Sequence, residues 1–467
     1  MSLPVHIVIE PGSYSLQNMG DVAMLQVAVR RLRLCFPSAE IRVLTHDPAA
    51  LAVYCPEAVA QNASGRAAWV SGGVLLGRLH GLMPAPLSRT LSGWRMAIGH
   101  RWPALVGALI AARLPTKSRV RFREFLAAVR DADLFLVVGQ GAMNDATRQH
   151  AETVLATLNL AQRAGVPTVM MGQGIGPLHE PGLAASARAV LPRVRLIALR
   201  EQLQGPSLLT GLGVPGTHMA VTGDDAVELA YEQRRGALGS GLGINLRVST
   251  NAGTDEKVVY TVREAIEDVV RSLGGPPVVP APIARGRAHD ADVIGRVTAG
   301  LEGGTASTGA WLDSPTLVIT RIADCRVLVT GAYHAAVFAL AQGIPVVCLE
   351  ASEYYVAKFN GLLDLFPGGG EIVPLHAPGF RQRLSAAVHR LWDEADNRRS
   401  GLLRAAAAQV AAGNSAYARL AALLSPDHQT STALLPGSSP PAVPLSRLLA
   451  SDASTVVAKP SFRSSSR

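Results

Sequence analysis

The 467-residue sequence predicts an α/β protein with two Rossmann-like domains, each built on a parallel sheet. Strand-like runs alternate with helical runs along most of the chain, and glycine-rich turns follow many of the strands, which is typical of βαβ units. The strands are apolar throughout, as in parallel sheets that helices cover on both faces. A glycine- and arginine-rich break near residues 233–240 divides these units into two series.

The first series predicts a domain over residues 1–235. Its expected strands are 6–10, 40–45, 134–139, 167–174 and 195–201, with helices near 20–35, 146–164 and 181–190. The second series predicts a domain over residues 236–425. It begins with a strand at 242–248 and a helix at 257–273, and its further expected strands are 277–283, 317–322, 325–330 and 344–349. Residues 426–467 are rich in Ser, Pro and Ala without hydrophobic periodicity, which predicts a disordered tail.

The composition excludes several classes of protein. Hydrophobic residues make up 48% of the chain and charged residues 17%, which suits a globular protein with a large core. No run of about 18 apolar residues predicts a transmembrane helix, and the N-terminus lacks the pattern of a signal peptide. The four cysteines are scattered without a CxxC pair, so we expect neither a disulfide framework nor a zinc site. These features predict a reducing compartment.

The net charge of +9 comes from one segment. Residues 61–130, interpreted as an insertion in the first domain, hold eleven Lys or Arg residues, one acidic residue, and Trp69, Trp94 and Trp102. We favour a helical excursion packed on the core with solvated arginines. The alternative is an amphipathic segment that contacts an anionic membrane surface or a phosphorylated ligand. Nucleic-acid binding is not expected, because no RNA- or DNA-binding motif accompanies the charge.

The loop after the first strand holds the first candidate site. Asn18, Gly20 and Asp21 stand at the start of a helix, where backbone N–H groups could bind an anion or a sugar hydroxyl. The plainer interpretation is that Asp21 only caps the helix. GxGxxG is absent here, so a dinucleotide fingerprint is not supported.

Two further strand ends of the first domain are rich in glycine and polar residues. The candidates are Gly139, Gly141, Asn144 and Asp145 after one strand, and Gln173 and Gly174 at the end of the next. Ligands gather outside the carboxyl ends of strands in open parallel sheets. We therefore expect these residues to line one rim of a site.

Two arginines follow or lie on strands. Arg200 follows a strand and could either pair with Asp224 or Asp225 as a structural clamp or bind a ligand. Asn245 and Arg247 are expected on the same face of the first strand of the second domain. An arginine in that place could bind a carboxylate or a phosphate.

The stretch VTGAYHAAVFALAQGIPVV, residues 329–347, predicts a strand, a small-residue helix and a second strand. With Thr330 as the cap, the first turn of the helix would hold Tyr333 and His334. The positive end of a helix disfavours an imidazolium ion. We therefore expect His334 to be a neutral donor, or to take up a proton only beside an anion.

Taken in order, these motifs resemble those of the polysaccharide pyruvyl transferase family. The resemblance spans about residues 5–370 and rests on NMGD, VVGQGAMND, GQGIGP, LRE, TGDDA, GINLR, AYHAAVFALAQGIPVV and YYVAKFNGL. It implies two Rossmann-like domains in a GT-B-like arrangement around an interdomain cleft. It also implies transfer of pyruvate from phosphoenolpyruvate, a co-substrate, to hydroxyls of a cell-surface polysaccharide or its lipid-linked precursor. No cofactor or metal is implied, and the expected location is the cytoplasm, or the periphery of the membrane on its inner face.

The resemblance also implies roles for single residues. His334 is expected to be the general acid or a phosphate contact, and Arg247, with Arg200, is expected to bind the anionic groups of the donor. Tyr333 and Lys358 are expected at the substrate.

One departure from the family pattern matters. Ala332 stands where the family has an arginine two residues before the histidine, so a bidentate anion clamp is missing. Arg247, Arg321, Arg326 or Lys358 could compensate, or the donor differs, or pyruvyl transfer is lost.

Two rival functions stay open. The first is a GT-B glycosyltransferase that uses a nucleotide sugar, for which Glu350 or Glu353 could bind the ribose. The second is a non-catalytic, glycan-binding member of the family.

Overall fold

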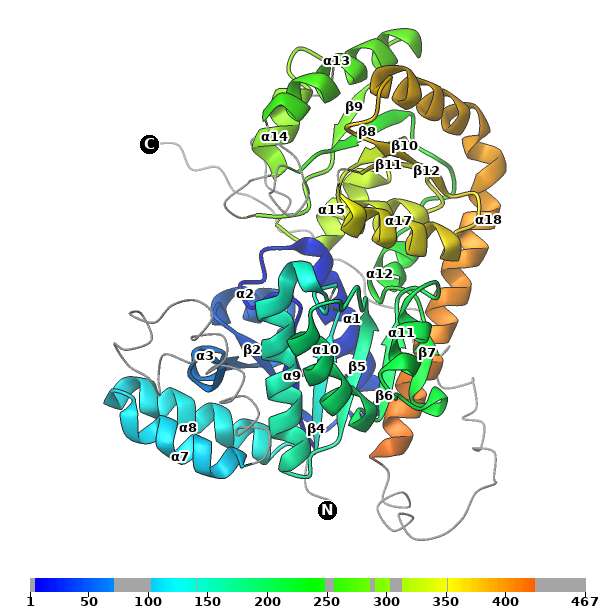
Figure 1. Ribbon diagram of the computed structural model, residues 1–467. Helices are drawn as coiled ribbons and strands as arrows, with labels where there is room; N and C mark the ends of the chain where they lie inside the picture. The colour runs from blue at the N-terminus through cyan, green and yellow to red at the C-terminus, as the bar shows by residue number, and fades with distance from the viewer. Residues whose placement is uncertain are drawn as a thin grey trace, which may run out of the picture. The chain divides into compact units, whose positions relative to one another are not determined.

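Two parallel β-sheets carry the fold (Figure 1). The computed structural model describes residues 5–70, 102–139, 141–247, 256–285, 290–302, 313–350 and 352–424. Helices accompany both sheets, so the predicted class, two Rossmann-like domains with parallel sheets, is confirmed. Residues 71–101 of the expected insertion and the expected tail at 426–467 lie outside the described residues.

The first sheet has seven strands in the order β3-β2-β1-β4-β5-β6-β7, and every neighbouring pair is parallel. The strands are β1 (His6–Glu10), β2 (Glu40–Thr45), β3 (Val59–Asn62), β4 (Leu134–Val138), β5 (Thr168–Gln173), β6 (Leu196–Leu199) and β7 (Met219–Val221). The helices are α1 (Met19–Cys35), α2 (Pro48–Tyr54), α3 (Ser64–Val70), α7 (Pro103–Arg113), α8 (Thr116–Arg130), α9 (Arg148–Arg163), α10 (Pro181–Val190), α11 (Gly205–Gly211) and α12 (Ala226–Glu232). Short 3₁₀ turns lie at Asp145–Thr147, Leu191–Arg193 and Gly216–His218.

The second sheet has five parallel strands in the order β12-β11-β10-β8-β9. They are β8 (Gly241–Asn245), β9 (Val278–Pro280), β10 (Cys325–Thr330), β11 (Val346–Glu350) and β12 (Gly370–Pro374). The helices are α13 (Glu256–Ser272), α14 (Asp290–Val297), α15 (Pro315–Ile322), α16 (Tyr333–Ala341), α17 (Glu353–Leu365) and α18 (Phe380–Leu423).

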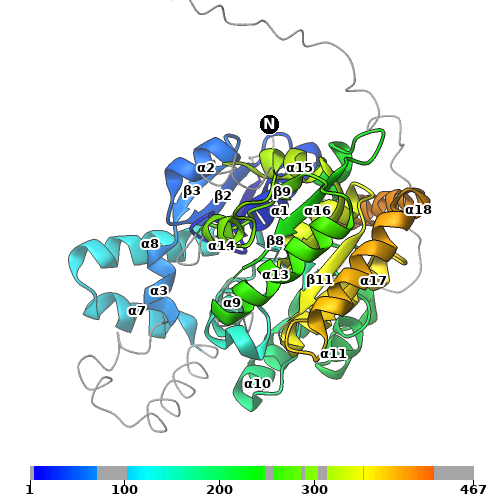
Figure 2. The same ribbon diagram turned by 90° about the horizontal axis from the view of Figure 1, so that it is seen from above.

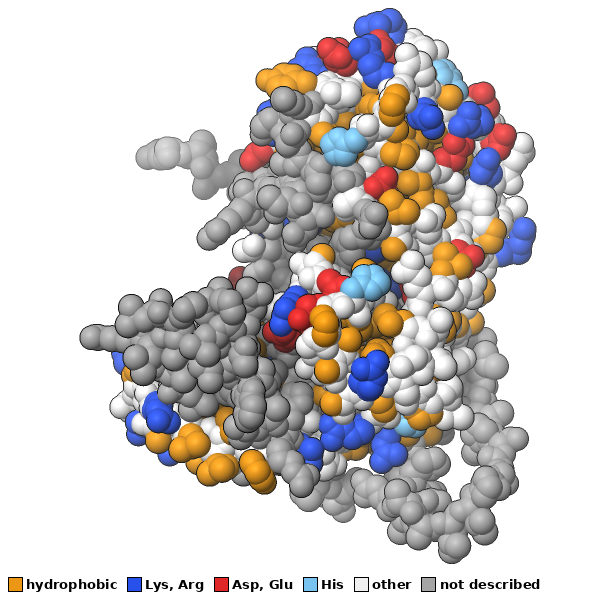
Figure 3. Space-filling model, in the orientation of Figure 1, with side chains coloured by type: hydrophobic (Ala, Val, Ile, Leu, Met, Phe, Trp, Pro, Cys, Tyr) orange, Lys and Arg blue, Asp and Glu red, His pale blue; other side chains and the backbone are white. Residues whose placement is uncertain are grey.

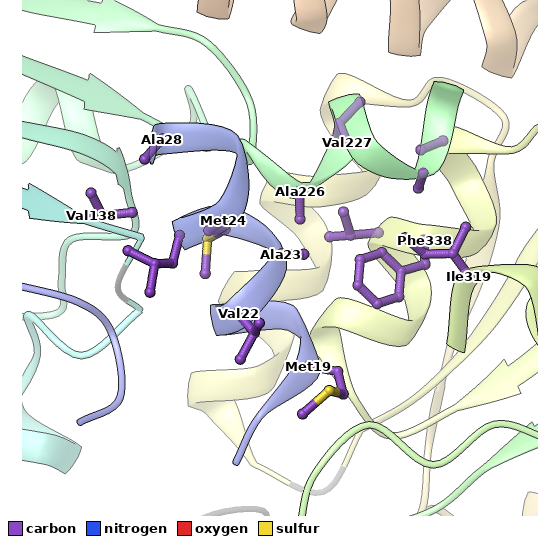
Figure 4. Close-up of a cluster of buried hydrophobic side chains, with 14 of the residues drawn as sticks. Met19, Val22, Ala23, Met24, Ala28, Val138, Ala226, Val227, Ile319 and Phe338 are labelled. Carbon is purple, nitrogen blue, oxygen red and sulfur yellow. The ribbon is translucent and has the colours of Figure 1, made fainter. Parts of the chain in front are cut away.

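A hydrophobic core joins the two halves of the chain around helix α1 (Figure 4). In Figure 4, Met24 of α1 lies between Val138 of β4 and Ala226 of α12, and the same cluster includes Phe338 of α16. Helix α1 buries most of its surface, because it packs against the first sheet and also against α12 and α15. The start of α1 is therefore set by contacts with both halves.

Helix α18 is the longest element, with 44 residues. It packs against β6 and α12 of the first half, and against α13, α16 and strands β10 to β12 of the second. Within the described ranges, no helix is both long enough and apolar enough to cross a membrane.

The hairpin formed by α7 and α8 lies at one side of the first sheet in both views (Figures 1 and 2). It packs against α3 and α9 through buried side chains that include Phe122, Phe125 and Trp69.

One expected strand is wrong. Residues 317–322 belong to helix α15, not to a strand. The helix begins after Ser314, whose side chain accepts a hydrogen bond from the Leu317 N–H at 3.3 Å, and Pro315 occupies its first position. Its buried residues Val318, Ile319 and Ile322 have helical rather than strand spacing.

Two further boundaries differ from the prediction. Strand β8 ends at Asn245, whose side chain donates to the Ala281 carbonyl at 2.8 Å, so Arg247 lies beyond the strand and shares no strand face with it. Helix α16 begins at Tyr333 and not at Gly331. The Thr330 hydroxyl oxygen instead accepts the Ala332 N–H at 2.9 Å, which closes the turn before the helix.

Candidate functional site

A cavity of about 180 Å³ lies where loops at the carboxyl ends of strands from both sheets meet. The loops after β1, β4 and β6 contribute from the first sheet, and those after β8, β9 and β10 from the second, together with α17. Its walls are formed by Gly12, Asn18, Asp21, Gly139, Gly141, Ala142, Arg200, Arg247, Ile283, Ala332, Tyr333, His334, Tyr355 and Lys358.

The loop before α1 is tied to both halves of the chain. Asn18 caps α1, because its side-chain oxygen accepts the N–H of Gly20 at 2.9 Å and of Asp21 at 3.5 Å. The Met19 N–H donates to the Ile283 carbonyl at 2.9 Å, and the Arg285 N–H donates to the Gln17 carbonyl at 2.8 Å. These backbone bonds hold the NMGD loop against the segment that follows β9.

Gly20 allows the N-terminus of α1 to approach His334. A Cβ atom on Gly20 would overlap the imidazole ring of His334. Any other residue at this position would displace the histidine or separate the two helices. The glycine of NMGD therefore has a packing role, which the sequence alone did not reveal.

His334 is buried, with 8% of its surface exposed. Its Nε2 atom lies 3.7 Å from a carboxylate oxygen of Asp224, and its ring packs edge-on against Tyr333 with centroids 5.3 Å apart. Burial lowers the pKa of His334 well below its ordinary value, and the positive charges of Arg200 and two other cations add to the effect. This shift favours the neutral ring, and its main cause is burial and not the helix terminus.

Arg200 occupies the centre of the cavity wall. Its guanidinium lies over the Tyr333 ring at 4.1 Å, and its Nη1 is 3.5 Å from an oxygen of Asp224. A Cβ atom on Gly141 or Gly174 would collide with this guanidinium, so the two glycine-rich turns leave the space that it fills. Of the two aspartates considered from the sequence, Arg200 pairs with Asp224.

Arg247 and Lys358 bring two more cations to the cavity. The Arg247 Nε lies 3.8 Å from an oxygen of buried Asp290, whose other oxygen accepts the backbone N–H groups of Ile283 and Ala284 at 3.0 Å. Asp290 thus links Arg247 to the segment after β9. Lys358 lies near the Tyr355 ring, with its Nζ 5.6 Å from the centroid.

Several ionisable groups of the cavity have shifted pKa values. Burial raises the pKa of Asp21 to about 7, against the opposing effect of Arg200 and the other cations. Burial also raises the pKa of Asp224 and lowers that of Lys358 well below its usual range. The net positive charge of the cavity therefore increases as the pH falls through neutrality.

The structure brings most of the predicted site residues together. The cavity walls include Asn18, Asp21, Gly139, Gly141, Arg200, Arg247, Tyr333, His334 and Lys358. Gly20 and Gly174 lie outside the wall, and their lack of a side chain leaves the space that His334 and Arg200 occupy.

Besides Gly20 and Gly174, four predicted residues are not part of the cavity wall. The Asn144 side chain bonds to the Gly141 carbonyl and the Thr147 N–H, and Asp145 accepts the N–H groups of residues 179 and 180. Gln173 donates to the carbonyls of residues 137 and 171, and Asn245 donates to that of residue 281. All four hold the surrounding loops in place instead.

Sequence reasoning missed Asp224, Asp290 and Tyr355 as parts of the site. The sequence does mark Asp224 as a candidate site residue, because it follows a strand in TGDDA. It was expected only as a possible partner of Arg200. The sequence marks Tyr355 as well, because it precedes Lys358 by three residues on one helix and so shares its face. Asp290 had no such signal in the sequence. Its role depends on the start of α14 packing against Arg247, which lies far earlier in the chain.

The structure narrows the set of cations that could replace the missing arginine at Ala332. Arg247 and Lys358 line the cavity beside Ala332. Arg326 pairs with Asp396 at 2.7 Å, and Arg321 lines a separate hollow at the amino ends of β8 to β10. Neither of these two residues is part of the cavity wall.

A model of the polysaccharide pyruvyl transferase family matches residues 18–353 of the chain. The match covers more than half of the sequence and includes the NMGD loop, Arg200, Arg247 and His334. The chain belongs to the polysaccharide pyruvyl transferase family. Among curated proteins, none matches it.

Solved structures similar to this family member share its fold over nearly the whole chain. A putative UDP-N-acetylglucosamine 2-epimerase from Listeria monocytogenes has a TM-score of 0.53 at 11% identity, over 92% of this chain and 98% of that one. The UDP-GlcNAc 2-epimerase from Neisseria meningitidis has the same score and identity, over 90% and 100%. A glycotransferase of kitacinnamycin has a TM-score of 0.50 at 16% identity, over 91% and 99%. At such low identities the similarity establishes the fold alone, which is the GT-B arrangement.

Proposed function

We propose that the protein transfers pyruvate from phosphoenolpyruvate to two hydroxyls of one sugar, which forms a cyclic ketal. The acceptor in this proposal is a cell-surface polysaccharide or its lipid-linked precursor, met on the cytoplasmic side of the membrane. The observation that carries the proposal is the convergence of Arg200, Arg247 and Lys358 with His334 on one small cavity. Three cations fit a donor that bears a carboxylate and a phosphate, and family membership supports the same class of reaction.

The volume of the cavity supports a small donor. Its roughly 180 Å³ exceeds the about 150 Å³ that suffice for benzene, so a small anion such as phosphoenolpyruvate fits.

The proposed reaction balances without a further reagent. The methylene carbon of phosphoenolpyruvate gains a proton, and the oxygen of the first sugar hydroxyl bonds to the adjacent carbon. The bond from that carbon to the phosphate oxygen then breaks, and phosphate leaves with the electron pair. The second hydroxyl oxygen closes the ketal. Of the two hydroxyl protons released, one balances the proton gained by the methyl group and the other leaves on phosphate.

In this proposal His334 and Asp21 move the protons. A bound polyanion offsets the positive charge of Arg200 and Lys358, so the pKa of His334 rises and the ring can donate a proton to the donor. Asp21, with a pKa of about 7, is present at neutral pH in both its acid and base forms, and its base form accepts a hydroxyl proton. Arg247, held by Asp290, would bind the carboxylate.

The test combines ligand binding with turnover. Thermal unfolding is measured with phosphoenolpyruvate and with UDP- and GDP-sugars, and labelled phosphoenolpyruvate is then incubated with lipid-linked glycans. We expect stabilisation by phosphoenolpyruvate, and transfer of label that Arg247→Ala and Lys358→Ala both reduce. Arg271→Ala, at an arginine with a 76% exposed side chain, is the matched control and should have no effect.

Two outcomes would contradict the proposal. Stabilisation by nucleotide sugars alone would favour a glycosyltransferase, and stabilisation by none of these ligands would favour a glycan-binding protein without this activity.

A further inference from the structure

Helix α7 exposes an apolar face. The residues Trp102, Leu105 and Leu109 are 57%, 56% and 44% exposed, and their spacing places them on one side of the helix. The opposite side is buried in the core, with Val106 at 3% and Ile110 at 0%. The segment Pro103–Ala112 has no charged or polar side chain. A helix that is apolar on all sides is normally buried on all sides or lies against lipid, yet α7 buries only one.

Basic side chains continue this face. Arg113 lies one turn beyond Leu109, and after a short turn exposed Lys117 and Arg121 stand next to Val120, which is 50% exposed. Residues 102–130 contain six basic residues and a single acidic one. Figure 3 shows hydrophobic side chains along α7 with Lys and Arg side chains beside them. We call Trp102, Leu105, Leu109, Arg113, Lys117 and Val120 the hairpin face.

We propose that the hairpin face docks on an anionic phospholipid surface. Trp and Leu side chains gain free energy by leaving water for the boundary between headgroups and acyl chains. Lysine and arginine beside them are attracted by the negative potential of such a membrane. A partner protein would need an apolar groove with an acidic rim, whereas an anionic bilayer presents both features over any area. Charge complementarity therefore favours lipid.

This inference does not rest on the proposed activity, since the hairpin face is made of other residues than the cavity. It would, however, hold the enzyme at the surface where a lipid-linked acceptor lies.

The test is co-sedimentation of the full chain with vesicles. Vesicles of phosphatidylcholine alone are compared with vesicles that contain a quarter phosphatidylglycerol, at low and at high salt. We expect binding to the anionic vesicles at low salt and much weaker binding to the neutral ones, because both the apolar and the ionic contributions are needed.

Two double variants separate these contributions. Leu105→Gln with Leu109→Gln removes apolar contact without a change of charge, and Arg113→Glu with Lys117→Glu reverses the charge. Each should weaken binding to anionic vesicles by about tenfold or more. The matched control, Tyr260→Glu with Arg271→Glu on α13, changes one exposed aromatic and one exposed arginine and should bind as the unchanged chain does. Thermal unfolding checks that every variant is folded.

Three results would overturn the inference. The first is that the chain does not bind anionic vesicles, and the second is that the folded hairpin variants bind them as well as the unchanged chain does. The third is that the unchanged chain sediments as a dimer without vesicles and the hairpin variants do not. The last would assign the hairpin face to contact with a second copy of the chain.

Discussion

At the scale of single residues, the neutral state of His334 depends on its surroundings more than on its place in the sequence. Burial and three nearby cations lower its pKa, whereas Asp224 at 3.7 Å is the one carboxylate recorded beside its Nε2 among the described residues. A donor that brings phosphate and carboxylate groups would offset the contribution of the cations and so raise the pKa of His334. The state of the histidine should therefore follow the occupancy of the cavity.

His334→Ala is expected to reduce kcat by about 10²–10⁴-fold, because the proton donor is lost. The chain should still fold, since the ring is replaced by a smaller group and not by a buried charge. Turnover on the true acceptor and thermal unfolding measure the two effects. The control is His389→Ala. His389 lies on α18 and forms a hydrogen bond with the Ser272 side chain at 2.8 Å, and its loss should leave turnover unchanged. Full activity of His334→Ala would remove this residue from the mechanism.

Asp21 predicts a dependence of stability on pH. Its pKa in the folded chain, about 7, lies above its ordinary 3.8, so its contribution to the free energy of unfolding is complete below pH 4 and is lost as the pH rises through 7. Asp21→Asn should therefore gain stability relative to the unchanged chain between pH 4.5 and pH 8, by up to about 3 kcal/mol. Urea unfolding at the two pH values measures the gain.

The control for this experiment is Asp131→Asn, at an exposed aspartate after α8. It should show the same difference from the unchanged chain at both pH values. If Asp21→Asn behaved in the same way, the Asp21 carboxyl would be ionised throughout this range, and its role as a proton acceptor near neutral pH would be lost.

At the scale of elements, the site depends on the contact between the N-termini of α1 and α16. Asn18 starts one helix and the Thr330 turn starts the other, and Gly20 lets them meet. A methyl group at Gly20 would have to push the His334 ring away. Gly20→Ala should therefore weaken phosphoenolpyruvate binding at least tenfold and lower the melting temperature.

Gly211→Ala provides the comparison. Gly211 ends α11, and nothing lies within 4 Å of the Cβ position there, so this change should be neutral or stabilise slightly. Binding titrations and thermal unfolding of both variants distinguish a local clash from a general effect of replacing glycine. Equal behaviour of the two variants would show that the close approach of Gly20 to His334 is not required.

The position of a strand or helix could be predicted where its hydrophobic pattern is strong, and not where that pattern is weak. β1 and β2 lie where the apolar runs predicted them, because an apolar run of five or six residues is too short for a buried helix. Residues 317–322 form a helix, because the Ser-Pro start and the burial of every third or fourth residue outweigh their β-branched composition.

At the scale of the whole molecule, a buried charge cluster connects α1, α12 and α18. Arg31 of α1 bonds to Asp225 at 3.0 Å and to Glu228, and its guanidinium lies 5.0 Å from the ring centre of Tyr417 on α18. Burial raises the pKa of Asp225 to about 6, although Arg31 opposes the shift. The cluster therefore connects the first half of the chain to the helix that packs on both sheets.

Arg31→Ala should lower the free energy of unfolding by about 3–5 kcal/mol, because it leaves the buried Asp225 carboxyl without its cation, while Glu228 keeps only Arg30. Arg30→Ala is the matched control on the same helix. The side chain of Arg30 is 41% exposed and pairs with Glu232 and with Glu228, which keeps Arg31, so its loss should cost about 1 kcal/mol or less. Urea unfolding measures both. Similar values for the two variants would mean that the Arg31 cluster is not a main source of stability.

The sequence by itself determined the fold class, the family resemblance and most of the residues around the cavity. It could do so because parallel strands place the residues that follow them at one edge of a sheet, and this order is visible in the chain. Gly141, Arg200 and His334 were identifiable in this way.

Only the tertiary structure decided which of these residues face the cavity and in what state. Asn144 and Asn245 stand in suitable motifs but bond to neighbouring loops, while Asp290 reaches Arg247, which lies far away in sequence. The pKa of Asp21 and the position of Arg247 likewise depend on burial and on contacts between the two halves. Such contacts arise from packing across long sequence separations, and local spacing carries no record of them.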